Sequence, residues 1–272
     1  MEAIRIPIEV SSRSEIVSFF PIGDVHLGAN SCEEKAFKRL LRKVAATNNA
    51  YVILMGDLID AITRTDPRFD SGGLADWIPI HRANTIAEVE LEYAVELLEP
   101  IKDKIVGAIV GNHEDKVAKH YGTDIHQRMC THLGIRNLSY SALIRFAFKR
   151  ANERSSIDVY AHHGHGGGRK AGAKVNRMHD EGGDVAADIY LMGHVHERGW
   201  SMKPILHMHK DKPLLVAKER HFGLTGTYLR TYKQGYSGYA EKSGFPPTSI
   251  GGIKWTVAFP ETGPRITTIN DA

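Results

Sequence analysis

Five apolar runs in this chain each end in a short segment rich in carboxylate, amide or imidazole groups, and this recurrence restricts the fold more than any other feature. The segments are GDVH (23–26), GDLID (56–60), GNHE (111–114), HHG (162–164) and GHVH (193–196). Each would lie where a strand leaves a sheet. In open α/β sheets, ligands and catalytic groups gather at these carboxyl ends. The sequence therefore predicts one site that is assembled from several strand ends.

Apolar runs and helical patterns alternate through the first half of the chain. We expect strands over 15–22, 51–55 and 105–110, and helices over 33–46 and 85–99, where apolar residues recur at helical spacing. Strands separated by such helices indicate an α/β fold whose sheet is at least partly parallel. The later apolar runs have little helix between them, which predicts a β-rich second half with strands over 143–148, 157–161, 189–192, 205–209, 214–216, 253–259 and 266–269.

The composition is typical of a globular chain. A length of 272 residues suits one large domain, and 42% hydrophobic with 25% charged residues argues against disordered or fibrous structure. The net charge of +3 is too small to indicate a nucleic-acid partner by itself. We expect no membrane span and no signal peptide, and the two cysteines cannot form a disulfide framework, so a cytoplasmic location is expected.

The donor groups in the five segments are typical of a hydrolytic metal site. A subset of these side chains, two aspartates, one asparagine and four histidines with no thiolate, favours Mn²⁺, Zn²⁺, Fe or Ni²⁺ over a structural zinc. They are too many for one tetrahedral ion, but they suit two ions about 3.5–4 Å apart that share a carboxylate. Any one histidine alone is more often a loop or core residue than a ligand. The prediction therefore depends on the set rather than on a single member.

The order D-x-H, G-D-x-x-D, G-N-H-E, H-G and G-H-x-H, from Asp24 to His196, resembles the calcineurin-like metallophosphoesterase superfamily. This resemblance implies an α/β fold, a four-layer αββα sandwich of two mixed β-sheets flanked by helices. It also implies a single metallophosphoesterase domain over 1–272, with a dimetal core over about 15–200 and a β-rich C-terminal extension over about 201–272.

The resemblance also implies residue roles and a cofactor, two divalent metal ions, with Mn²⁺ foremost and Zn²⁺, Fe or Ni²⁺ as alternatives. His113 matches the catalytic histidine, which contacts the substrate, and Asp60 matches the acid that orients that histidine in some members. At one ligand position His162 is an alternative to His163, and the glycine that follows favours His163. The implied ligands are Asp24, His26 and His196 for the first ion, Asn112, His163 and His194 for the second, and Asp57 as the bridge.

The implied activity is that of a hydrolase acting on ester bonds, in which a metal-bridging hydroxide attacks a phosphate ester. Ala61 stands where serine/threonine protein phosphatases have arginine, so that class is disfavoured. Arg64 or Arg68 is a candidate substitute that would bind substrate phosphate, and both are equally readable as solvated loop charges. Two alternatives stay open: a phosphomonoesterase acting on a small molecule or phosphoprotein, and a non-catalytic scaffold such as a retromer subunit of this superfamily.

Two segments favour a phosphodiester substrate, either nucleic acid (a nuclease) or a nucleotide. The loop 166–177, with Arg169 and Lys170, starts beside His163 and carries cations that would meet a phosphate backbone, unless it is a plain surface turn. Tyrosines and cations interleave over 228–242 as in single-strand binders, unless the tyrosines form a packing face. The loop 61–84, with Trp77, is a candidate lid or an ordinary insertion. The oligomeric state is left open.

Overall fold

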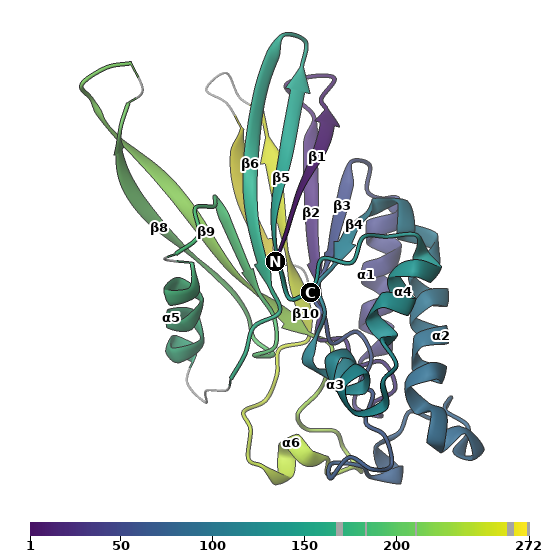
Figure 1. Ribbon diagram of the computed structural model, residues 1–272. Helices are drawn as coiled ribbons and strands as arrows, with labels where there is room; N and C mark the ends of the chain where they lie inside the picture. Colours follow the sequence, from purple (N-terminus) through teal and green to yellow (C-terminus); the bar gives the residue numbers. More distant parts are fainter. Residues whose placement is uncertain (167–170, 183, 210, 260–263, 271–272) are drawn as a thin grey trace.

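The computed structural model describes residues 1–166, 171–182, 184–209, 211–259 and 264–270 (Figure 1). None of the helices it describes is long and apolar enough to cross a membrane. Three short 3₁₀ helices cover Ser71–Gly73, Ile80–Thr85 and Glu99–Lys104. The strands and α-helices are β1 (Glu2–Glu9), β2 (Ile16–Ile22), α1 (Glu34–Ala46), β3 (Ala50–Leu54), α2 (Ile86–Leu98), β4 (Ile105–Ala108), α3 (Asn112–Tyr121), α4 (Ile125–Leu133), β5 (Ser141–Arg150), β6 (Glu153–His162), α5 (Ala171–Glu181), β7 (Ile189–Met192), β8 (Arg198–Met208), β9 (Leu215–Thr227), α6 (Tyr239–Lys242), β10 (Gly251–Ala258) and β11 (Arg265–Asn270).

The strands form two mixed sheets. In one, β1, β5, β6, β7 and β9 lie side by side, and β8 pairs with β9. In the other, β10, β2, β3 and β4 follow one another, and β11 pairs with β10. The two sheets join where Gly251 and Gly252 pair with Thr227 and Gly226. Because β2–β3–β4 and β6–β7–β9 are parallel, the predicted α/β class with partly parallel sheets is confirmed.

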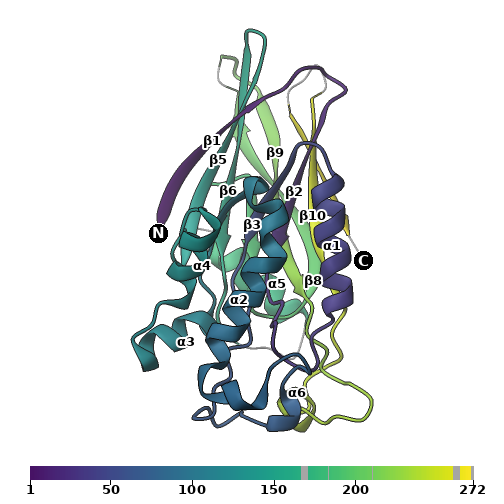
Figure 2. The same ribbon diagram turned by 90° about the vertical axis from the view of Figure 1, so that its right-hand side faces the viewer.

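Helices cover the outer faces of the two sheets, which pack on each other. Phe19 of one sheet and Phe146 of the other lie with ring centroids 4.5 Å apart in the shared core. On the outer side of the β2–β3–β4 sheet lie α1, α2 and α4 (Figure 2). On the outer side of the other sheet, α5 packs beside Tyr190 and Phe222 (Figure 1). The fold is therefore the four-layer αββα sandwich that the resemblance implied.

The residues after 200 are not confined to one edge of the molecule. Strands β9 and β10 lie between β7 and β2 in the strand order, and Trp255 of β10 is buried in the core between the sheets. Strands from both ends of the chain thus share one core, which supports our proposal of a single domain over 1–272. The β8–β9 hairpin projects away from the sandwich (Figure 1).

Candidate dimetal site

The five polar segments meet at one edge of the sandwich. The strands β2, β3 and β4 are parallel, so their carboxyl ends face the same way. Main-chain hydrogen bonds continue past the strand ends, from Asp24 N to Gly56 O (3.0 Å) and from His26 N to Asp57 O (3.1 Å). The first two segments therefore lie side by side with their side chains at the same edge.

Most of the predicted ligands have a left-handed backbone conformation. Such φ values are unfavourable for residues other than glycine, cost on the order of 1–3 kcal/mol each, and cluster at functional sites. The residues are Asp24 (φ 49°), His26 (53°), Asp57 (50°), His194 (65°) and His196 (51°). The sandwich thus holds unfavourable local geometry at the positions that the motifs single out.

The close approach of the second and third segments requires a glycine. A Cβ atom at Gly111 would lie 2.1 Å from the main-chain nitrogen of Asp57 and 2.5 Å from Oε2 of Glu114. Gly111 also begins helix α3, so Asn112 and His113 occupy its first turn. Any larger residue at 111 would push these two side chains away from Asp57.

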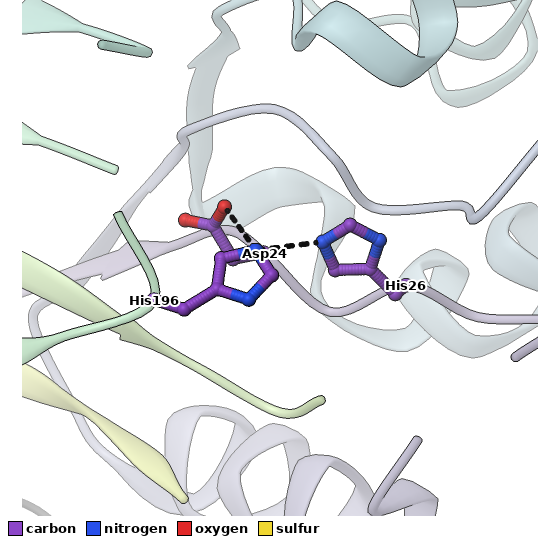
Figure 3. A group of neighbouring side chains, drawn as sticks. All are labelled: Asp24, His26 and His196. Carbon is purple, nitrogen blue, oxygen red and sulfur yellow. Dashed lines mark hydrogen bonds and ion pairs between the residues drawn. The ribbon is translucent and has the colours of Figure 1, made fainter. Parts of the chain in front are cut away.

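Asp24, His26 and His196 form the first donor group (Figure 3). The Nε2 atom of His196 lies 3.0 Å from Nε2 of His26 and 3.4 Å from Oδ1 of Asp24. Asp24 and His26 are buried, at 0% and 2% exposure, while His196 is partly exposed. All three point their ligand atoms at one small volume, as the first metal site requires.

Asp57, His163 and His194 form the second donor group, beside Asn112. Oδ2 of Asp57 lies 3.3 Å from Nε2 of His163 and 3.9 Å from Nε2 of His26. Oδ1 of Asn112 lies 3.1 Å from His163 Nε2 and 2.6 Å from His194 Nδ1. Asp57 thus contacts members of both groups, which is the position expected of a bridging ligand.

The hydrogen bonds of the histidines turn lone pairs toward the centre. His163 donates from Nδ1 to the main-chain oxygen of Met55 (2.7 Å), so in the neutral ring its Nε2 atom is an acceptor. That acceptor faces the oxygen atoms of Asp57 and Asn112. Acceptors that face acceptors repel unless a cation or a proton lies between them. The donor set therefore fits a bound cation, with each imidazole oriented by its other nitrogen.

The pKa shifts of Asp57 and His163 also fit a bound cation. Burial alone would raise the pKa of Asp57, but His163, His113 and His26 outweigh it and hold that pKa well below its usual range. Burial alone would lower the pKa of His163, yet Asp57 raises it to about 10. The carboxylate thus stays ionised and attracts positive charge, which a divalent cation would supply.

Asp60 and His113 differ from the prediction in how they are connected. The prediction has the Asp60 side chain orient His113, but its Oδ1 lies 3.0 Å from Nδ1 of His26 and 3.8 Å from Nδ1 of His113. His113 instead donates from Nδ1 to the main-chain oxygen of Asp60. Because the main-chain oxygen already takes this hydrogen bond, the carboxylate is left to orient the candidate ligand His26.

Glu114 supports the site, although no role was predicted for it. Its side chain is buried and accepts hydrogen bonds from the main-chain nitrogens of Asp57 (3.0 Å), Leu58 (2.7 Å) and Gly111 (3.1 Å). It therefore ties the bridging loop to the start of α3. Its place as the last residue of G-N-H-E was the signal available in the sequence.

A cleft of about 640 Å³ opens over the two donor groups. Its floor includes His26, Asp57, Asn112, His194 and His196. Its rim comes from two segments, 61–79 and 228–249, which carry the cleft-lining residues Arg68, Phe69, Leu74, Tyr236, Tyr239 and Phe245. The second segment includes α6, which lies at the same end of the molecule as α3 (Figure 1).

The cationic residues predicted to bind substrate differ in whether the structure describes them and whether they line the cleft. Arg169 and Lys170 lie outside the described residues. Arg64 is exposed and is not among the residues that line the cleft. Lys174, in the segment predicted to be a cationic loop, instead lies in helix α5, where it lines the cleft and pairs with Glu197 at 2.8 Å. The alternative cation, Arg68, lies with Nη1 3.4 Å from Nε2 of His113.

Three further residues singled out in the sequence, His162, Tyr228 and Trp77, lie outside the two donor groups. His162 accepts a hydrogen bond from Gly164 N (3.0 Å) and is in neither donor group, whereas His163 is. Tyr228 is buried against Phe37, as a packing residue. Trp77 donates to Glu34 and packs on Tyr93, so it anchors its loop instead of lining the cleft.

The chain is similar to a known protein family in part of its sequence and to some solved structures at low identity. No curated protein matches the sequence. A Vps29 mutant from Entamoeba histolytica is 11% identical, with 94% of this chain and 100% of that chain covered and a TM-score of 0.40. A metallophosphoesterase from Sphaerobacter thermophilus is 12% identical, with 94% and 89% covered and a TM-score of 0.37. Residues 19–198 match the family described as calcineurin-like phosphoesterase, which is more than half of the sequence. The chain therefore belongs to the calcineurin-like phosphoesterase family.

Proposed function

We propose that this protein is a dimetal-dependent phosphoesterase that prefers phosphodiesters, with a nucleic acid or nucleotide as substrate. The observation that carries the proposal is the pair of donor groups at the floor of a cleft, with Asp57 of the second group 3.9 Å from His26 of the first. The ligands we assign are Asp24, His26 and His196 for one ion, and Asn112, His163 and His194 for the other. Mn²⁺ is the metal we propose, because the carboxylate and amide oxygens suit it, and the four imidazoles make Zn²⁺, Fe or Ni²⁺ the alternatives.

Divalent cations at these ligands would supply an activated water and neutralise phosphoryl oxygens. The side chains of the chain do the remaining work. Asp60 holds the ring of His26 through Nδ1 (3.0 Å), and its main-chain oxygen holds the ring of His113. His113 lines the cleft with Nε2 directed away from that anchor, so it is placed to donate a proton to the leaving oxygen.

The charge around His113 supports this role as an acid. Burial alone would lower the pKa of His113, but the carboxylates of Asp57 and Asp60 outweigh it and raise that pKa. A raised pKa favours the protonated ring. The proton is then available when the ester bond breaks.

The rim supports a diester substrate with an organic group on each side of the phosphorus. Tyr236, Tyr239 and Phe245 give the cleft an aromatic wall, and base stacking on such rings is typical of single-strand binding. The volume of about 640 Å³ lies within the usual range for small-molecule sites, which favours a nucleotide or a strand end over a duplex. A cytoplasmic location is part of this proposal and is supported only by the low cysteine content.

The test is hydrolysis by purified protein loaded with Mn²⁺, Ni²⁺ or Zn²⁺. We expect activity on a bis-aryl phosphate to exceed that on a mono-aryl phosphate, and activity on single-stranded DNA to fall steeply with salt. A monoester preference with a flat salt response would contradict the diester assignment. Bound metal without turnover of any ester would favour the scaffold alternative.

A further inference from the structure

Arg68 is held at the mouth of the donor groups. Its Nη1 atom lies 3.4 Å from Nε2 of His113, the nitrogen that faces the cleft. Arg68 also lines the cleft together with Asp57 and Asn112. Its side chain is 30% exposed, so the guanidinium is partly covered and still reaches the open volume.

The rest of the guanidinium is fixed by one carboxylate. Asp66 accepts from Nε (3.1 Å) and Nη2 (2.9 Å) of Arg68, and also from its main-chain nitrogen (2.9 Å). The Asp66 side chain is only 3% exposed and pairs with Lys116 of α3 as well. This two-pronged contact sets the plane of the guanidinium and leaves Nη1 as the edge that faces His113 and the cleft.

Burial alone would raise the pKa of Asp66, but Arg68 and Lys116 outweigh it and hold that pKa well below its usual range. The carboxylate that fixes Arg68 is therefore ionised at any pH at which the enzyme would work. The arginine is fixed before any ligand arrives, and an arginine keeps its charge at all such pH values.

We propose that Arg68 contacts the substrate and binds a phosphoryl oxygen on the His113 side of the cleft. This proposal rests on the proposed function and deepens it, because it adds a group that recognises phosphate and is not a metal ligand. Guanidinium groups bind phosphate oxygens through charge-assisted hydrogen bonds of fixed geometry. Arg64, only four positions earlier in the same loop, is exposed and outside the cleft, so it is a matched control.

The first experiment compares Arg68→Ala, Arg68→Lys and Arg64→Ala in Mn²⁺-loaded protein. We expect kcat/KM of Arg68→Ala to fall by on the order of 10–100-fold, as for the loss of a hydrogen bond to a charged group. Arg68→Lys should recover part of this loss. Added guanidinium should raise the activity of Arg68→Ala but not that of Arg64→Ala or of the wild type. Values for Arg68→Ala within twofold of the wild type would overturn the proposal.

The second experiment measures binding of inorganic phosphate by calorimetry and needs no turnover. We expect the dissociation constant to rise about tenfold in Arg68→Ala, with unchanged metal content and unchanged affinity in Arg64→Ala. Equal phosphate affinity in all three proteins would overturn the assignment. If the wild type hydrolyses no ester, the proposed function fails, and this comparison still decides whether Arg68 binds phosphate. Arg68→Lys serves both experiments if Arg68→Ala does not fold.

Discussion

The floor of the cleft and its rim are built in different ways. The floor is lined by five of the seven assigned ligands and by His113, with Asp24 and His163 buried beside them. Its segments follow strand ends and are fixed by main-chain hydrogen bonds such as Asp24 N to Gly56 O. The rim, segments 61–79 and 228–249, is more exposed, with Tyr239 at 56% and Phe245 at 41% exposure. Its two segments are tied to residues 28–33 by a few main-chain hydrogen bonds, such as Asn30 N to Gly73 O (2.7 Å) and Arg230 N to Ser31 O (3.0 Å), and by side-chain contacts such as Lys233 with the main-chain oxygen of Asn30.

This difference assigns different tasks to the two regions. The geometry of the floor is imposed by the two sheets, so changes there should alter metal content and reaction rate. The rim lies outside the strands and carries exposed aromatic side chains, so side-chain changes there should alter substrate affinity alone. Four substitutions test this division.

Asp57→Asn should have the largest effect. Asp57 lies between the donor groups, 3.3 Å from His163 and 3.9 Å from His26, and the amide lacks the charge that offsets two cations. We expect bound metal, measured by elemental analysis, to fall toward zero, and metal-dependent turnover to disappear with it. Asp184→Asn, at an exposed position outside the cleft, should retain both. A variant that kept two ions would remove the bridging assignment.

His113→Ala should separate chemistry from metal binding within the floor. His113 is not one of the assigned ligands, although it lies with His26 and Asp60 in a third cluster of possible metal ligands. Loss of a proton donor lowers rates by about 10²–10⁴-fold. We expect that loss in kcat with unchanged metal content. His120→Ala is the control, because His120 is exposed on the same helix. Loss of metal together with activity would instead make His113 a ligand.

The floor was predictable from the sequence because its signals are local. Strands β2, β3 and β4 are short apolar runs, and each polar segment follows such a run directly, so the pairing of the strands alone brings Asp24 and Asp57 together. Helices α3 and α4 were not predicted. The first turn of α3 is the polar motif itself, Asn112–Asp115, which has no apolar periodicity.

The rim was not predictable, because its contacts are set by the tertiary fold. Arg64 and Arg68 are equivalent in sequence, and only the ion pair with the buried Asp66 separates them. Likewise, the tyrosines of 228–242 divide into the buried Tyr228 and the cleft-lining Tyr236 and Tyr239. The sequence also does not show that the main-chain oxygen of Asp60 accepts the hydrogen bond from His113 while its carboxylate lies 3.8 Å from the same ring.

Tyr239→Ala tests the rim. The side chain is exposed and lines the cleft, so its loss should leave stability within about 0.5 kcal/mol. If it stacks on a base, KM for single-stranded DNA should rise by on the order of tenfold, with kcat and metal content unchanged. Tyr140→Ala, 51% exposed and outside the cleft, should show no such change. A change in kcat rather than KM would break the division between floor and rim.

Glu90→Gln probes the junction between the two regions and should have the smallest effect on catalysis. Glu90 of α2 is buried and accepts a hydrogen bond from Ala61 N (2.7 Å), where the floor segment 56–60 passes into the rim. Its other oxygen, Oε1, has no hydrogen-bond partner among the described residues. Burial, with a contribution from Asp60, raises the pKa of Glu90 well above its usual value. The acid is therefore neutral in the folded chain over a range where it is ionised in the unfolded chain.

A raised folded-state pKa fixes the sign of the pH dependence. The stability that wild-type Glu90 contributes is complete below its unfolded pKa of about 4.3 and falls as pH rises toward the folded pKa, by at most about 1.4 kcal/mol per pH unit. Glutamine keeps the bond to Ala61 but does not ionise. We expect urea unfolding of the metal-free proteins to show Glu90→Gln gaining on the wild type between pH 5 and pH 7. Glu96→Gln, exposed on the same helix, should not gain. If the difference in unfolding free energy between Glu90→Gln and the wild type stayed constant with pH, the pKa of Glu90 would be the same in the folded and unfolded chains. The junction would then hold a charged carboxylate behind the floor.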